Sequence, residues 1–496
     1  MAITPGASLN SVPAPRQQAL NTNYIDFNTD MGWAQQYLPD LMEKEAEVFG
    51  PRTISGFLSQ VGAEESMSGD QVIWSEQGRL HLSYKCDIDA DNIITIQSDI
   101  DGNGFAADGM LNHGVRLNDT VIVAAPTGVY KGVVTLVNLT AATSADITVA
   151  TYDAVTIPTS GNTADSATTL LVYGSEFAKG VGYNQADGTT VESRGANEPQ
   201  FKTFSNKPII MKDYYEVSGS DTSRIGWVET TAEEGKSGYL WYLKAEADTR
   251  ARFTDYLEMA MLEGEIDRLD ASSNDVDLHL YGVDGTNTVG TEGLFAAIEA
   301  RGNLTSGITG VNAATDLAEF DAILAEFDKQ GAIEENMMFV NRATSLAMDD
   351  MLASMNSYGA GGTSYGVFNN SEDMALNLGF SGFRRGSYDF YKSDFRYLND
   401  LATRGGINAA YAAGAIRGVI IPAGTSTVYD QQLGKNLKRP FLHVRYKASQ
   451  TDDRKLKTWV TGSVGATTSA LDAMQIHMLS ERCLVTQGAN NFMLMK

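Results

Sequence analysis

The sequence predicts an α+β fold that carries an inserted all-β domain, and three patterns predict it. Residues 239–263 have the spacing of one long amphipathic helix. Short β-rich runs separated by turn residues fill the stretch from about residue 90 to 190. Beyond Gly264, helix-like and strand-like segments alternate. A chain of 496 residues has room for about three folded units, so these patterns can belong to different parts of it.

The N-terminal part predicts an extended arm followed by a short helix. Residues 1–30 contain Pro5, Pro13 and Pro15 among small polar residues, without apolar periodicity. Such an arm is either disordered or ordered by lying on a neighbouring subunit. Residues 33–48 place apolar side chains at helical spacing and end before Gly50-Pro51. Residues 71–84 (QVIWSEQGRLHLSY) predict an extended hairpin or a long projecting loop.

The β-rich block predicts a small barrel or sandwich. Its apolar and β-branched runs are residues 93–96, 120–124, 133–137, 147–150 and 170–173. Turns of Gly, Asn, Asp, Ser and Thr separate them. Because the segments on both sides resemble two halves of one other element, we expect this block to be an insertion.

The long helix is predicted to serve as a structural spine. Its apolar residues fall on two adjoining rows at spacings of four: Leu243, Ala247 and Ala251, then Phe253, Leu257 and Met261. At roughly 1.5 Å per residue the helix would be a rod of about 37 Å.

The second half predicts a mixed α/β region followed by β-strands. Residues 315–330 open with the cap candidates Thr315 and Asp316 and end at Gly331. Their apolar stripe is Leu317, Phe320, Ile323, Leu324 and Phe327. A strand at 337–340, a helix at 343–355 and a Gly-rich loop at 357–366 follow. The later β candidates are residues 388–391, 418–421, 442–446 and 456–460.

Composition disfavours several function classes. A formal net charge of −25 would repel a phosphate backbone, which argues against a sequence-reading nucleic-acid binder. Cys86 and Cys483 lie far apart without CxxC or Cys/His clustering, so we expect neither a disulfide framework nor a zinc site. The first thirty residues lack the pattern of a secretion signal, and no long apolar run suggests a membrane span.

No motif predicts an active site. Ser364 stands in a Gly-x-Ser-x-Gly pattern, but neither a buried strand before it nor a helix after it is predicted. A flexible loop at a subunit contact is therefore expected there. The histidines at 81, 113, 279, 443 and 477 are scattered, which favours structural roles. Basic clusters at 384–385, 435–439 and 454–457 either face solvent or face acidic surfaces of a neighbour.

A weak metal candidate lies at Asp99, Asp101 and Asn103. With Gly104 these residues begin a sequence like a calcium-binding loop, but the twelfth position is Met110 instead of a bidentate carboxylate. Ordinary turn chemistry is the preferred interpretation. A weak structural calcium site stays as the minor alternative, and no cofactor is predicted.

The order of the predicted elements resembles the HK97-like fold of tailed-bacteriophage major capsid proteins, including crAss-like or related branches. The segments that carry the resemblance are GYLWYLKAEADTRARFTDYLEMAMLEG, NMMFVNRATSLAMDDML and FRRGSYDFYKSDFRYLND. The resemblance implies an N-terminal arm and helix (1–70), an extended loop (71–90 and 195–230) and an inserted β-barrel-like domain (91–194). It further implies a peripheral domain with the spine helix (231–270 and 441–496) and an axial α/β domain (271–440).

The same resemblance implies what the chain does. Such a subunit self-assembles into hexamers and pentamers that form an icosahedral head around double-stranded DNA, without sequence-specific DNA binding. The implied partners are other copies of the chain and portal, scaffolding and possible decoration or auxiliary capsid proteins, with no membrane. The chain would be made in the host bacterial cytoplasm and reside in the virion capsid.

Two other classes stay open. A lattice-forming or adhesion surface protein would share the acidic charge and the turns, although it would usually carry a signal sequence. A serine hydrolase would use Ser364 as its nucleophile and would need a base beside it.

Overall fold

The computed structural model describes residues 63–77, 83–100, 113–137, 145–159, 168–187, 190–193, 201–222, 229–231, 237–267, 276–281, 289–331, 333–356, 382–423, 425–430, 435–463 and 469–496. The described residues form two compact units. Unit 1 comprises Met211–Met259 and Leu456–Ser480, and unit 2 comprises the described parts of Leu58–Ile210, Ala260–Lys455 and Glu481–Lys496. The predicted arm at 1–30, the predicted helix at 33–48 and the Gly-rich loop with Ser364 lie outside these residues.

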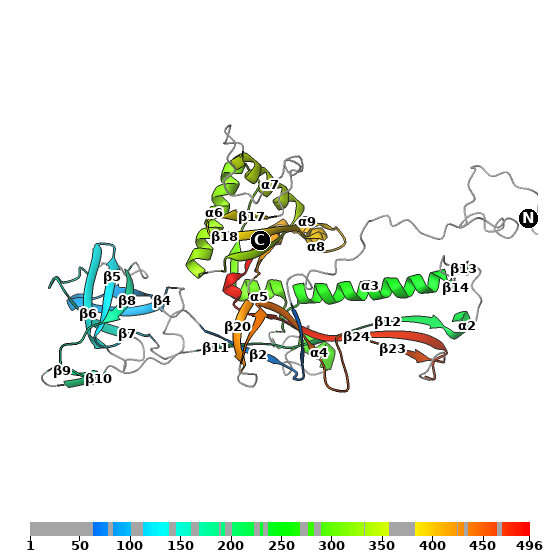
Figure 1. Cartoon of the computed structure of the whole chain (residues 1–496), viewed down its shortest axis with the longest axis horizontal. Helices are drawn as coiled ribbons and strands as arrows, with labels where there is room; N and C mark the ends of the chain where they lie inside the picture. Colours follow the sequence, from blue (N-terminus) through cyan, green and yellow to red (C-terminus); the bar gives the residue numbers. More distant parts are fainter. Residues whose placement is uncertain are drawn as a thin grey trace, which may run out of the picture. The chain divides into compact units, whose positions relative to one another are not determined.

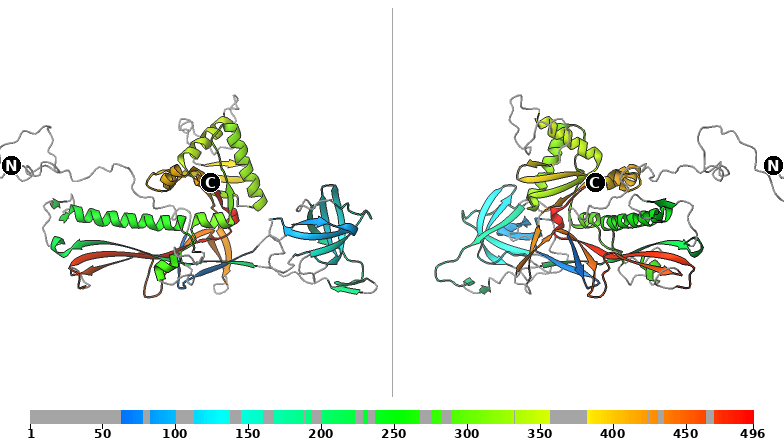
Figure 2. Two further views of the ribbon diagram at one scale, coloured as in Figure 1. Left: turned by 180° about the vertical axis from the view of Figure 1, so that it is seen from behind. Right: turned by 45° about the vertical axis from the view of Figure 1, so that its right-hand side comes forward.

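Unit 1 consists of a long helix on an antiparallel sheet (Figures 1 and 2). The elements are α3 (Leu240–Glu263), β12 (Ile209–Ser218), β23 (Lys457–Gly462) and β24 (Ala473–Thr486), with the short α2 (Gly219–Thr222), β13 (Glu229–Thr231) and β14 (Ser237–Tyr239). Strand β24 pairs with both β12 and β23. Phe253 and Leu257 of α3 are buried with Met478 of β24.

The predicted spine helix is confirmed, but only one of its two predicted apolar rows is buried. Phe253, Leu257 and Met261 are each at most 3% exposed. Ala247 is exposed and Ala251 is half-buried. The four-residue spacing gives a narrow stripe, and a flat sheet covers only one such stripe of a helix.

Unit 2 contains a six-stranded mixed sheet with helices packed on it (Figure 1). Its order is β15 (Asn303–Thr305), β25 (Met493–Met495), β19 (Gly418–Pro422), β16 (Glu335–Val340), β18 (Tyr388–Asp394) and β17 (Gly382–Arg385). The helices are α5 (Leu294–Arg301), α6 (Ala313–Gln330) and α7 (Arg342–Asn356). An aromatic core joins α6 to the sheet: the rings of Phe320 and Phe390 lie 5.2 Å apart.

The predicted elements of this region are confirmed, with one correction at α6. Its N-cap is Asn312, whose side-chain oxygen accepts from the Thr315 N–H at 2.9 Å; the predicted caps Thr315 and Asp316 lie inside the helix. Asn312 is the N-cap because it precedes the predicted caps by one turn and has an extended backbone, so its side-chain oxygen can accept from a free amide of the first turn. Gly331 ends the helix as predicted, in the left-handed conformation with φ 66°. The predicted β runs at 388–391, 418–421 and 442–446 lie within β18, β19 and β22 (Leu442–Lys447), and the run at 456–460 overlaps β23.

Six strands of unit 2 close into a barrel. They are β3 (Ser83–Ile88), β4 (Ile93–Asp99), β7 (Ala145–Thr151), β6 (Gly128–Val137), β5 (Asp119–Ala125) and β8 (Thr168–Ser175), in that order around it. Each of the five predicted β-rich runs lies within one of these strands. The barrel also contains β3, which the sequence assigned to the extended loop. Tyr84, Cys86 and Ile88 alternate into the barrel core, which accounts for the difference.

Of the two interpretations of residues 71–84, the local hairpin is wrong and the long projecting loop stays a prediction. Strand β2 (Val72–Gln77) pairs antiparallel with β11 (Phe201–Asn206), more than a hundred residues later in the chain, and not with β3. The residues that precede and follow the barrel in sequence thus form one two-stranded ladder.

The other elements of unit 2 are short or lie at edges. The strands are β1 (Ala63–Met67) beside β22, β9 (Asn184–Asp187) paired with β10 (Thr190–Ser193), and β20 (Thr425–Asp430) paired with β21 (Lys435–Pro440). The helices are α4 (Val276–Tyr281), α8 (Arg396–Asn399) and α9 (Arg404–Ala410). Short 3-10 turns lie at Ala90–Asn92, Ala412–Gly414 and Ala489–Asn491. Among the described residues, none of the helices is long and apolar enough to cross a membrane.

Candidate interaction surfaces

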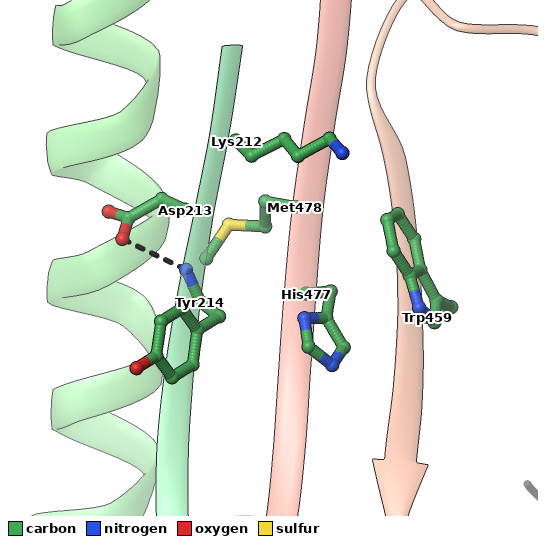
Figure 3. Close-up of a pocket in the computed structure, with 6 residues that line it drawn as sticks. All are labelled: Lys212, Asp213, Tyr214, Trp459, His477 and Met478. Carbon is green, nitrogen blue, oxygen red and sulfur yellow. Dashed lines mark hydrogen bonds between the residues drawn. The ribbon is translucent and has the colours of Figure 1, made fainter. Parts of the chain in front are cut away.

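A row of aromatic rings crosses the sheet of unit 1 on the face opposite α3. Met478 and Met211 pack toward α3, so their neighbours in the alternating strands point the other way. Tyr214 of β12, His477 of β24 and Trp459 of β23 form the row (Figure 3). The ring centroids of Tyr214 and His477 lie 6.0 Å apart, and those of His477 and Trp459 lie 5.2 Å apart, both stacked.

This row borders an open groove of about 260 Å³. The groove is lined by Lys212, Asp213, Tyr214, Trp459, His477 and Met478. The hydroxyl oxygen of Thr461 lies 2.7 Å from Nε2 of His477, which fixes the imidazole, while Asp213 pairs with Arg252 of α3 at 3.2 Å. Tyr214 is 56% exposed, so the groove offers aromatic surface and a lysine ammonium to a partner.

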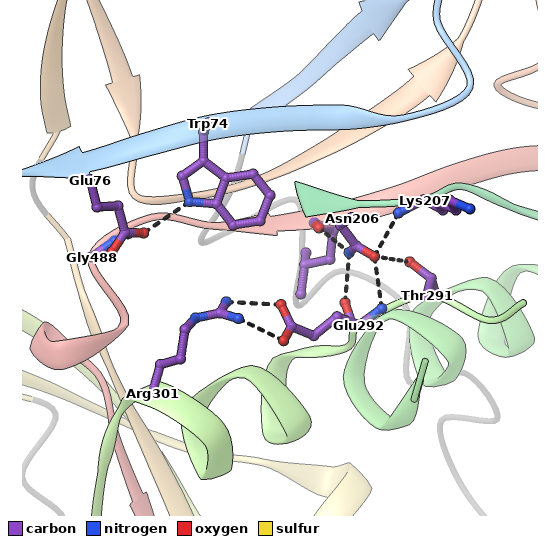
Figure 4. A network of polar contacts seen from close by, with 9 residues as sticks. Trp74, Glu76, Asn206, Lys207, Thr291, Glu292, Arg301 and Gly488 are labelled. Carbon is purple, nitrogen blue, oxygen red and sulfur yellow. Dashed lines mark hydrogen bonds and ion pairs between the residues drawn. The ribbon is translucent and has the colours of Figure 1, made fainter. Parts of the chain in front are cut away.

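A buried amide anchors the base of the β2–β11 ladder to the rest of unit 2 (Figure 4). Asn206, the last residue of β11, is 1% exposed. Its Nδ2 donates to the carbonyls of Glu292 at 2.9 Å and Leu484 at 2.6 Å. Its Oδ1 accepts from the amides of Lys207 and Glu292 and from the Thr291 hydroxyl. The amide therefore uses both donors and its acceptor to hold three separate segments together.

A second contact on the same ladder is a guanidinium held between a carboxylate and aromatic rings. Arg301 of α5 donates two parallel hydrogen bonds to Glu292, at 2.7 and 2.8 Å. Its guanidinium carbon lies 4.7 Å from the ring centroid of Phe204 and 6.0 Å from that of Trp74. Glu76 accepts from Trp74 Nε1 and from the Gly488 amide, each at 2.9 Å. These contacts join both strands of the ladder to α5 and to the segment around Gly488.

The predicted metal candidate is only partly described. Asp99 ends β4 opposite Tyr84 of β3, whereas Asp101 and Asn103 lie outside the described residues. Within the described part of the chain, no group of three or more His, Cys, Asp or Glu side chains could hold a metal ion. The calcium hypothesis thus stays a prediction, as does the hydrolase hypothesis on Ser364.

The histidines occupy unrelated environments. His113 is 1% exposed in unit 2, and burial together with the charge of Arg116 lowers its pKa to about 4. His443 lies buried with Nδ1 3.2 Å from the Pro440 carbonyl, and His279 is exposed on α4. His81 lies outside the described residues. The structure brings no two of the four described histidines into one site.

Basic side chains of the predicted clusters pair with acidic side chains of the same chain, where the structure describes them. Arg385 makes two contacts with Asp321, at 2.5 and 2.7 Å, and Arg384 lies 3.6 Å from Asp389. Arg454 contacts Glu481 at 2.5 Å. The side chains of residues 435–439 are outside the described set.

Sequence reasoning did not predict the roles of Asn206, Arg301 or the aromatic row. Asn206 stands in the turn-like segment SNKP, and its partners Glu292 and Leu484 are distant in sequence. The one available signal was the alternation of residues 209–218, which predicts a strand with Tyr214 on its exposed face.

The chain is similar to structures from phages, and to no family model or curated protein sequence. A structure from Microbacterium phage Oxtober96 is similar over 95% of this chain and 99% of that chain, with a TM-score of 0.38 and 8% identity. A capsid structure of cyanophage P-SCSP1u is similar over 96% and 98%, with a TM-score of 0.38 and 8% identity. The mature capsid of bacteriophage PhiM1 is similar over 64% and 78%, with a TM-score of 0.31 and 11% identity.

Proposed function

We propose that the chain is the major capsid protein of a tailed bacteriophage, a structural subunit whose function is self-assembly. In this proposal, hexamers and pentamers of one sequence form an icosahedral head around double-stranded DNA. The observation that carries it is the β2–β11 ladder, which is anchored at its base by buried hydrogen bonds but, among the strands that the structure describes, pairs with no further strand.

A two-stranded ladder is marginally stable in water unless another surface covers it. Ile73 of β2 is 65% exposed, and Ile210 just beyond the ladder is 55% exposed. The Arg301 guanidinium on the Phe204 ring and the Asn206 amide hold the base of this ladder to the rest of unit 2. An anchored element with an exposed apolar side chain suits a contact with a neighbouring subunit.

Exposed apolar side chains elsewhere support the same proposal. Leu401, Ile407 and Tyr411 are 79%, 54% and 64% exposed within one short stretch around α8 and α9 of unit 2. The groove of unit 1 adds Tyr214. Scattered single exposures are ordinary, but several on separate elements fit a subunit that contacts several neighbours.

The proposal includes a domain layout and a set of partners. In this layout residues 1–70 form the arm and helix, 71–90 and 195–230 the extended loop, 91–194 the inserted domain, 231–270 and 441–496 the peripheral domain, and 271–440 the axial domain. Two strands are moved because of their pairing: β3 (Ser83–Ile88) joins the barrel, and β25 (Met493–Met495) joins the six-stranded sheet. Portal, scaffolding and decoration or auxiliary proteins are the further partners. The net charge of −25 suits a wall that encloses DNA without gripping it.

Expression of the chain alone and with its neighbouring genes, followed by sedimentation and negative-stain electron microscopy, tests the proposal. We expect closed shells, sheets or tubes of ring-shaped capsomers. A discrete monomer or dimer in both preparations would contradict it. Planar lattices on a cell surface would instead favour the lattice-forming alternative.

A further inference from the structure

Strand β1 is attached to unit 2 in an unusual way. Among the described strands it is the outermost of its sheet and pairs parallel with β22, which pairs on its other side with β24. Its side chains bury little: Glu64 and Ser66 are exposed, and Glu65 and Met67 are half-buried. The hydrophobic effect, which holds most edge strands in place, therefore contributes little here.

Charged contacts replace apolar burial. Glu64 pairs with Lys455, Glu65 contacts Arg445 at 2.9 Å, and Asp70 just after the strand pairs with Lys447. A hydrogen bond from Lys447 and its positive charge hold the pKa of Asp70 below its usual value. Ion pairs of this exposure contribute little each and weaken with salt.

One of these basic partners also has a carboxylate outside β1. Lys447 lies 3.7 Å from Glu481. If β1 leaves, Lys447 keeps that neighbour, whereas Lys455 and Arg445 lose their contacts with Glu64 and Glu65 until an equivalent strand replaces them. The departure does uncover the edge of β22, a row of backbone donors and acceptors that favours another strand.

We propose that β1 exchanges between copies, so that β1 of one chain pairs with β22 of a second copy. The inference rests on the proposed function, because an assembly keeps neighbouring copies at high effective concentration. Exchange preserves every contact of β1, since donor and acceptor are the same sequence. Residues 68–71, which include Gly69, link β1 to β2 and would have to change conformation in the exchange.

Cysteine pairing tests the exchange directly. Ser66 and Tyr446 are register partners in the β1–β22 pair, at a spacing that a disulfide spans. One chain carries Ser66→Cys and another Tyr446→Cys, and the two are mixed before assembly and then oxidised. The native Cys86 and Cys483 should stay silent, because burial raises the pKa of each thiol to about 12.

A matched control uses a pair that cannot exchange. Arg384 and Asp389 are register partners in the β17–β18 hairpin, where only a tight turn joins the strands. We expect the S66C and Y446C mixture to give about tenfold more disulfide-linked dimer than the R384C and D389C mixture, given the effective concentration in an assembly. The double variant S66C/Y446C confirms that the two positions can bond.

Assemblies that form without a linked dimer, while the double variant bonds within one chain, would overturn the exchange and leave the capsid proposal intact. An unsubstituted chain that does not assemble in sedimentation would overturn both. If these cysteine chains fail to assemble, a second register pair replaces them, with Met67→Cys on one chain and Lys447→Cys on the other. A linked dimer from that mixture supports exchange, whereas bonding only within the double variant M67C/K447C refutes it.

Discussion

Substitution of Asn206 by alanine should release the β2–β11 ladder from the body of unit 2. The change removes the partners of the Glu292 amide, the Glu292 carbonyl and the Leu484 carbonyl at a site that is 1% exposed. A lost hydrogen bond that leaves a buried group unsatisfied costs about 1 kcal/mol or more, so the three together cost about 3 kcal/mol. At 1.36 kcal/mol per tenfold, that is a change of about 100-fold in the local opening equilibrium.

Native-state amide hydrogen exchange read by mass spectrometry measures this opening. It reports the stability of one segment, which suits a chain of several units better than a global unfolding curve. Peptides that cover residues 72–77 and 201–206 should lose about 100-fold of their protection in Asn206→Ala, given the free energy above.

Ser205→Ala is the matched control, because Ser205 is the exposed neighbour on the same strand. It should change protection by no more than about twofold, as surface substitutions usually do. If the amides of the ladder are equally protected from exchange in the two variants, the Asn206 side chain does not anchor the ladder and the role assigned to it is wrong.

Three further predictions concern the cores. Burial lowers the pKa of His113 from 6.5 to about 4 in the folded state. Because the unfolded chain then binds the proton more readily, the free energy of unfolding should fall by about 3 kcal/mol as pH drops from 6.5 to 4. Denaturation curves of His113→Leu should lack this contribution. Phe253→Ala should destabilise unit 1 by about 3–5 kcal/mol, seen as lost amide protection in α3, whereas Tyr256→Ala on the exposed face should cost little. Cys86 and Cys483 should resist iodoacetamide in the native chain at pH 8 and react only after unfolding, because burial raises both pKa values to about 12.

The helices and most strands could be predicted because their signals are local. The spacing of Phe253, Leu257 and Met261 identifies the buried face of α3 from nine consecutive residues. A single residue, Gly331, identifies the end of α6. Strand pairing was harder, because the whole barrel sequence separates β2 from its partner β11. The resemblance placed these two segments on the two sides of one extended loop, but no local pattern gave their register. The 14-residue strand β24 was missed since it is buried over most of its length and shows no alternation.

The candidate surfaces were harder still, for a physical reason. Asn206 and Arg301 act through partners brought together by the fold, and a single polar residue in a turn has many possible roles. Two kinds of contact serve different parts of the described chain. Buried apolar side chains form the three cores, whereas hydrogen bonds and ion pairs attach the β2–β11 ladder and β1. Apolar contacts give a unit that folds by itself, and polar attachments can be traded for equivalent ones on another copy at small net cost. In the proposed function a subunit must be stable alone and then join identical copies, which requires both kinds of contact.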